Sequence, residues 1–187
     1  SWQKFLELFK EILAILVIMA LVAYFSSRAV VQGYQSLANE DTAQKEAALE
    51  GLNQVGLAVQ AYNNYMLRGD EKYVAVFKER TDEIRNQIEI FGKLVEDDKE
   101  RTLFEASKKA FDDFEHTMQE VRTARQKTTN AAELDKMLGT GHEKKLREAL
   151  KEMDELADKT FKEKNTGLNS TAARANMIQL LLVITAV

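Results

Sequence analysis

The sequence predicts an all-α protein, an up-down-up-down four-helix bundle between two transmembrane helices. Apolar segments lie near the two ends of the 187 residues, and no Pro, the main helix breaker, occurs anywhere in the chain. Between these segments, apolar residues recur at alternating spacings of four and three, the pattern of a packed helix face. These observations together predict long helices that share one core.

The first apolar segment is predicted to be a transmembrane helix over residues 12–31. Its only charged residue is Arg28, whose long side chain can place the guanidinium group at the membrane surface. At 1.5 Å per residue it spans roughly 30 Å, the thickness of a bilayer's hydrocarbon core. A cleaved signal peptide is the alternative, but its best cleavage site, Ser27-Arg28-Ala29, contains an Arg.

Orientation follows from the basic residues that precede this segment. Lys4 and Lys10 place residues 1–11 in the cytoplasm by the positive-inside rule. Residues 32–175 then form an extracytoplasmic sensor domain, and residues 176–187 begin a second, truncated transmembrane helix. This layout predicts a multi-pass membrane protein whose central domain lies outside the cytoplasm.

Three short breaks divide the region between the anchors into helices. Gly69 and Asp70 suit a helix C-terminus and the next N-cap. Residues 96–98 are acidic and suit another helix N-terminus, and residues 139–141 form the third break. Asn130 and Glu133 resemble a capping box, so residues 130–138 either extend the third helix or form a separate turn.

Each helix offers one apolar face for the core. The predicted faces, in order from the first helix to the fourth, are as follows. The first helix offers Leu49, Leu52, Val55 or Gly56, Val59, Tyr62 and Met66, and the second offers Phe77, Ile84, Ile88, Phe91 and Val95. The third offers Leu103, Ser107, Ala110, Phe114, Thr117, Val121 and Ala124, and the fourth offers Leu146, Leu150, Met153, Ala157, Thr160, Gly167 and Thr171.

The segment Tyr65-Met-Leu-Arg-Gly-Asp-Glu-Lys-Tyr-Val74 resembles a helix corner in the sensory bundles of bacterial methyl-accepting chemotaxis receptors. CHASE3-type sensor modules of histidine kinases have a similar corner. The resemblance implies a homodimer, a HAMP linker and a cytoplasmic module that contacts a kinase and an adaptor. Some relatives carry paired Arg before this corner to bind acidic ligands, whereas this chain has Gln60, Tyr62, Asn63 and Asn64 there.

Polar residues that interrupt the apolar faces are the candidate ligand-binding residues. Gln60, Asn63, Asn64 and Arg80 are expected at a similar level of the bundle, and an Arg there favours an anionic solute. The alternatives are an Arg that covers the helix seam with its stem and an Asn that fixes dimer register.

The residue types give no indication of an enzyme or a cofactor site. The chain has no Cys, and its two His lack a second ligand at metal spacing, so a solvated face is favoured over a metal cluster around His116. A net charge of −4 disfavours nucleic acid as a partner.

Two classes of function remain open from the sequence. The first is a chemotaxis receptor that senses a small extracytoplasmic solute and transmits a helix displacement across the membrane. The sensor region of a histidine kinase is a variant of this hypothesis. The second class is a non-sensing, membrane-anchored helical scaffold protein.

Overall fold

The protein is all-α in the computed structural model, which describes the backbone of residues 2–138 and 141–186 and the side chains up to residue 181. Within these residues the elements are α1 (Trp2–Ser36), the π-helix η1 (Leu37–Asp41), α2 (Thr42–Arg68), α3 (Lys72–Lys93), α4 (Asp98–Glu115), α5 (Thr117–Arg125), α6 (Ala131–Met137) and α7 (Gly141–Ala186). They group into two compact units, residues 1–39 with 161–187, and residues 40–160. The second unit covers fewer residues than the predicted domain, which was residues 32–175.

The first unit contains the apolar N-terminal helix. This helix is long and apolar enough to cross a membrane, and no residue of its most apolar window is buried. Near its end, the Tyr34 hydroxyl lies 2.6 Å from Asn169 Oδ1 of α7. A Cβ at Gly33 would collide with the Leu168 side chain, so the absence of a side chain at Gly33 permits this close approach.

The predicted second membrane helix, residues 176–187, lies only partly within the described residues. Residues 177–186 continue α7 as helix, and Met177, Ile178, Leu180 and Leu181 are exposed apolar side chains. The side chains from residue 182 onward and all of residue 187 lie outside the described part of the chain. Gly167 and Thr171, predicted to extend the core face of this helix, are exposed.

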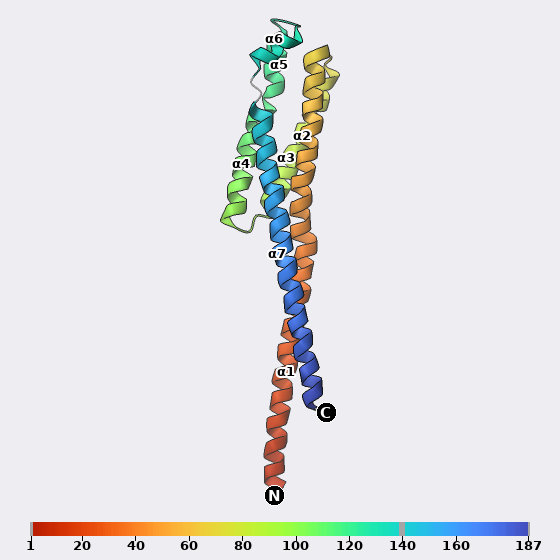
Figure 1. Cartoon of the computed structure of the whole chain (residues 1–187), viewed down its shortest axis with the longest axis vertical. Coiled ribbons are helices and arrows are strands. Elements are labelled where there is room, and N and C mark those ends of the chain that lie inside the picture. Colours follow the sequence, from red (N-terminus) through yellow and green to blue (C-terminus); the bar gives the residue numbers. More distant parts are fainter. Residues whose placement is uncertain (1, 139–140, 187) are drawn as a thin grey trace. The chain divides into compact units, whose positions relative to one another are not determined.

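The second unit places four long helical segments around one hydrophobic core. Figure 1 shows α2, α3, α4 and the first half of α7 side by side in this unit, with α5 and α6 at one end. Ser107 Oγ of α4 lies 2.7 Å from Met153 Sδ of α7, and Lys45 of α2 forms an ion pair with Asp158 of α7. The large, fully buried core side chains come from α2, α3, α5, α6 and α7: Val55, Ile84, Ile88, Phe91, Val121, Leu134, Leu146, Leu150 and Met153. α4 adds the buried side chains of Phe111 and Phe114.

Most of the predicted α2 face packs on the core: Val55 is fully buried, and Leu52, Val59, Tyr62 and Met66 are partly buried against it. Leu49 is the exception, and α2 also buries residues that were not predicted. Leu49 was predicted in the core and is 56% exposed, whereas the adjacent Ala48 is fully buried. The buried residues of α2 are mostly small: Gln44, Ala47, Ala48, Gly51, Gln54, Val55, Ala58, Ala61 and Tyr65. A Cβ at Gly51 would lie 3.4 Å from Leu150, so the small residues let α7 approach α2 closely.

Two of the three predicted breaks are helix ends with backbone or side-chain hydrogen bonds at them. In the third, residues 139 and 140 lie outside the described part of the chain, and Gly141 begins α7. Gly69 has φ 70° and ψ 14°, and its N–H donates to the Tyr65 carbonyl at 2.8 Å, as expected of a left-handed C-cap. Asp70 was predicted as the N-cap of α3, but Glu71 takes that position, and Asp70, one residue earlier, accepts from the Lys72 N–H at 3.0 Å. Asp97 caps α4 by accepting from the Glu100 N–H at 2.8 Å.

The predicted third helix is divided at His116 into α4 and α5. Thr117 Oγ1 donates to the Phe114 carbonyl at 2.7 Å, and His116 Nδ1 lies 2.6 Å from the Asp112 carbonyl oxygen. Because a carbonyl only accepts, Nδ1 carries the proton and donates. These side chains bond to carbonyls of the last turn of α4, which favours a local departure from the regular helix.

Residues 131–137 form a separate helix, so the region that the sequence left open does not extend the third helix. The Asn130 side chain caps α6 by accepting from the N–H groups of Ala132 and Glu133 at 3.0 and 3.4 Å. Leu134 of α6 is fully buried and anchors this short helix on the core of the unit.

Candidate functional site

A cavity of about 110 Å³ lies in the second unit, between α2, the α4–α5 junction, α6 and the start of α7. Five elements supply its lining, and α3 supplies none of it. The lining residues are Val59, Tyr62, Asn63, Met66, Phe114, Thr117, Asp135, Leu138 and Glu143. A concave site with an apolar wall and a few polar groups is the usual form of a small-molecule pocket.

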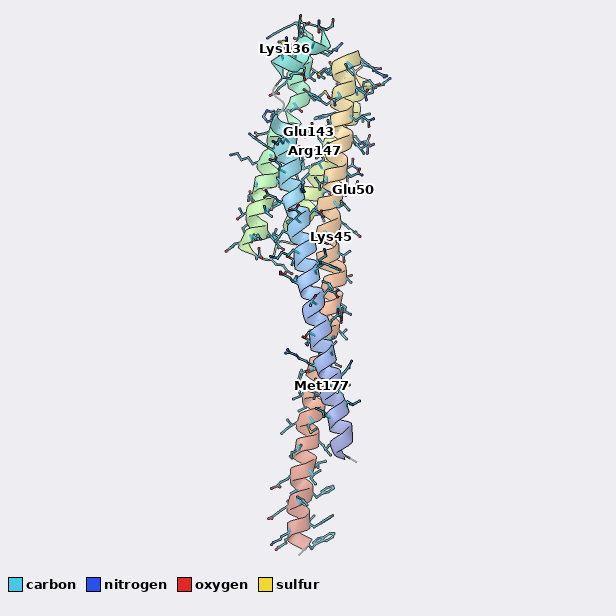
Figure 2. The ribbon with its side chains drawn as sticks, viewed as in Figure 1. Lys45, Glu50, Lys136, Glu143, Arg147 and Met177 are labelled. Atoms are coloured by element: carbon cyan, nitrogen blue, oxygen red, sulfur yellow. The ribbon has the colours of Figure 1, made fainter. Side chains whose placement is uncertain are left out.

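Local structure explains why polar groups from distant parts of the sequence meet there. Tyr62 and Asn63 lie one turn before the end of α2, whose C-terminus is held by Arg125 donating to the Met66 carbonyl. The Asn130 cap sets the direction of α6 and with it the position of Asp135. Glu143 lies in the first turn of α7 and accepts from Arg147 Nε at 2.6 Å, one turn further along the helix (Figure 2).

The charged residues of the cavity lining are both carboxylates, Asp135 and Glu143. Burial first, and then the negative charges of Glu120, Asp135 and Glu143, raise the pKa of the Tyr62 hydroxyl to about 12. Tyr62 therefore stays neutral and can donate a hydrogen bond throughout the physiological pH range. Among the residues that the structure describes, Arg147 is the only ion-pair partner of Glu143, and Glu120 and Asp135 form no ion pair.

A larger hollow of about 570 Å³ adjoins the cavity and shares Leu138 with it. Both histidines of the chain line this hollow, together with Glu120 and Lys127. The buried Nδ1 atom of His142 has no hydrogen-bond partner within the described part of the chain. In residues 2–138 and 141–186, no three His, Asp or Glu side chains are grouped so that they could hold a metal ion.

The four candidate ligand-binding residues from the sequence do not come together. Asn63 is the only one that lines the cavity. Gln60 is exposed on α2 and Asn64 is half-buried. Arg80 of α3 is half-buried, with Nη1 donating to Gln54 Oε1 at 3.3 Å and Nη2 lying 3.2 Å from Glu79 Oε1. The environment of Arg80 therefore matches the alternative of a seam residue with partners of its own.

Sequence reasoning missed most of the polar cavity lining. Asp135 and Glu143 were not among the residues singled out in the sequence, because their places at the cavity depend on how the helices pack. The Asn130 capping pattern was the one available signal, since a helix start at residue 131 requires a turn before it.

Comparison of the chain with protein-family models, with curated proteins and with solved structures finds no match. The site must therefore be interpreted from its own geometry and charge.

Proposed function

We propose that this chain is the sensory region of a membrane receptor of the chemotaxis-receptor kind. In this proposal α1 and the end of α7 cross the bacterial inner membrane. Residues 40–160 form an extracytoplasmic up-down-up-down four-helix bundle that binds a small solute in the cavity at Tyr62 and Asn63. Binding displaces helices that continue through the membrane to a cytoplasmic signalling module with its kinase and adaptor.

One observation carries the proposal. A single helical stretch, Trp2–Arg68, contains both the apolar segment suited to a membrane and the residues of α2 that line the cavity. A solute that moves α2 by the 1–2 Å typical of helix shifts in such switches thus acts on the same helix that enters the membrane. The π-helix η1 lies within this stretch, and π-helical turns often occur at functional sites.

A homodimer is part of the proposal. Leu49 and Leu67 of α2 are 56% and 61% exposed, and they are about five helical turns apart, which places them on the same side of the helix. Gln60 is exposed between them on that side. Exposed leucines along one side of a helix suit contact with a second copy, and confinement to a membrane raises the effective concentration for that contact.

The test is a chimera in which this chain precedes the cytoplasmic module of a well-characterised chemotaxis receptor. Val59 lines the cavity, so Val59→Phe fills it and should change the basal kinase activity by mimicking occupancy. Val76→Phe, at a 37% exposed position of α3, is the matched control and should leave kinase activity unchanged.

The chimera also distinguishes a sensor from a scaffold. Thermal unfolding of both variants must show that the bundle remains folded. If the folded Val59→Phe chimera has the same kinase activity as the parent, the cavity is not coupled to output, and the scaffold hypothesis gains support.

A further inference from the structure

The chemical class of the solute follows from the charges that surround the cavity. We propose that the cavity binds the ammonium group of a small organic cation, an inference that rests on the proposed solute-sensing function. Its lining contains the two carboxylates Asp135 and Glu143 and no Lys or Arg. An ammonium group carries the complementary charge and three hydrogen-bond donors.

The two carboxylates differ in how much charge they leave for a ligand. Glu143 forms an ion pair with Arg147, with 2.6 Å between Glu143 Oε1 and Arg147 Nε, and this partly neutralises its charge. Asp135 forms no ion pair with any residue that the structure describes, and neither does Glu120 of the adjoining hollow. The negative charge of Asp135 is therefore the one available for a cation, and Glu120 strengthens the field.

The remaining lining also suits an ammonium ion. The aromatic side chains of Tyr62 and Phe114 belong to the wall, and aromatic faces attract cations through their quadrupole. Asn63 offers a side-chain oxygen as a neutral acceptor. Burial, and after it the negative charges of Glu120, Asp135 and Glu143, raise the pKa of Tyr62 to about 12.

The volume of the cavity limits the size of the ligand group that can enter it. A cavity of about 110 Å³ is small beside the pockets of about 300–1,000 Å³ that usually bind drug-sized ligands, so it suits a small ligand head. This matches a primary amine with a two-carbon chain. A longer ligand would extend past Leu138 into the adjoining hollow of about 570 Å³.

Two other ligand classes fit less well. A metal ion needs several converging ligands, and no group of three His, Asp or Glu with that potential exists in the described residues. An anion would meet two carboxylates in a lining that contains no basic residue. The anion predicted from the sequence depended on Arg80, which does not line this cavity and has Gln54 and Glu79 as partners.

The experiment compares three probes of four non-hydrogen atoms each: ethanolamine, protonated near neutral pH; ethylene glycol, which is neutral; and acetate, which is an anion. The full chain in lipid nanodiscs carries carbon-13 in its methionine methyl groups. Met66 lines the cavity and reports occupancy, and Met19 in α1 is the internal control. We expect ethanolamine to shift the Met66 signal saturably at constant ionic strength, while ethylene glycol and acetate leave it in place.

A charge variant then identifies the contact. Asp135→Asn keeps the shape of an exposed side chain and removes its charge, so ethanolamine affinity should fall at least about tenfold. Asp82→Asn is the matched control, because Asp82 is an exposed aspartate of α3, which contributes nothing to the cavity. Its ethanolamine affinity should equal that of the parent.

The outcomes separate the two proposals. A saturable Met66 shift with acetate or ethylene glycol of equal or higher affinity overturns the cation class but leaves solute binding in this cavity intact. Unchanged ethanolamine affinity in Asp135→Asn overturns the assigned contact. If none of the three probes shifts Met66, the cation site is rejected. The Val59→Phe chimera then decides separately whether the cavity is coupled to output.

Discussion

Tyr62 is the residue on which the account of the cavity can be tested most simply. In the folded chain its pKa is raised to about 12 by burial and by Glu120, Asp135 and Glu143, while an unfolded tyrosine titrates near 10. The raised value means that the folded state holds this proton more tightly. Its stabilising contribution is therefore complete below about pH 10 and is lost as the pH rises from there towards 12.

We predict that Tyr62→Phe removes a late tyrosine ionisation step from the titration of the chain. Ultraviolet titration of the parent should show a phenol that ionises near pH 12, and this step should be absent in the variant. Tyr24→Phe, in the exposed apolar helix, is the control and should retain the late step. A parent whose tyrosines all titrate together near pH 10 would contradict the electrostatics assigned to the cavity.

Individual residues also show where the apolar spacing in the sequence predicts burial correctly and where it does not. Ile84, Ile88 and Phe91 were predicted in the core from their spacing and are buried. Leu49 of α2 was also predicted in the core and is exposed. Periodicity favours the largest apolar residues, whereas α2 buries its small ones so that backbones can approach. Whether a helix turns its leucines or its alanines to a neighbour depends on interhelical distance, and a single sequence does not specify that distance.

At the scale of elements, most helix faces and several helix ends were predictable. Gly69 and Asn130 take the capping roles that their residue types favour. The division at His116 was missed because Thr and His are common inside helices. Their bonds to the Phe114 and Asp112 carbonyls form only in the folded geometry. The cavity was missed for a related reason, since it depends on the packing of α6.

The cap of α4 gives a prediction at this scale. Asp97 accepts from the Glu100 N–H at 2.8 Å, and Glu100 Oε2 accepts from the Glu96 N–H at 2.7 Å, so carboxylates hold both sides of the turn. Asp97→Ala should lower the free energy of unfolding by about 1 kcal/mol, the usual cost of a lost N-cap.

Chemical denaturation of the detergent-solubilised chain measures the cost of losing this cap. Glu105→Ala, at an exposed site within α4, is the control and should change the free energy of unfolding by less than about 0.5 kcal/mol. Equal losses in the two variants would show that the Asp97 cap contributes nothing beyond an ordinary surface carboxylate.

At the scale of the whole molecule, the central claim is that α1 crosses a membrane and that the bundle unit lies on the far side from the N-terminus. Gly69 is a poor site for a reporter because its positive φ and the nearby Arg125 side chain disfavour any Cβ there. Lys4 and Lys136 are both exposed, and the chain has no Cys of its own. Single cysteines at these lysines therefore report topology without background (Figure 2 labels Lys136 on α6).

The measurement is labelling of Lys4→Cys and Lys136→Cys in intact bacterial cells with permeabilised outer membranes, using a maleimide that cannot cross the inner membrane. The account predicts that the cysteine at position 136 reacts in intact cells and that the cysteine at position 4 reacts only after lysis. Labelling of position 136 only after lysis would place the bundle in the cytoplasm and contradict the proposed extracytoplasmic sensor.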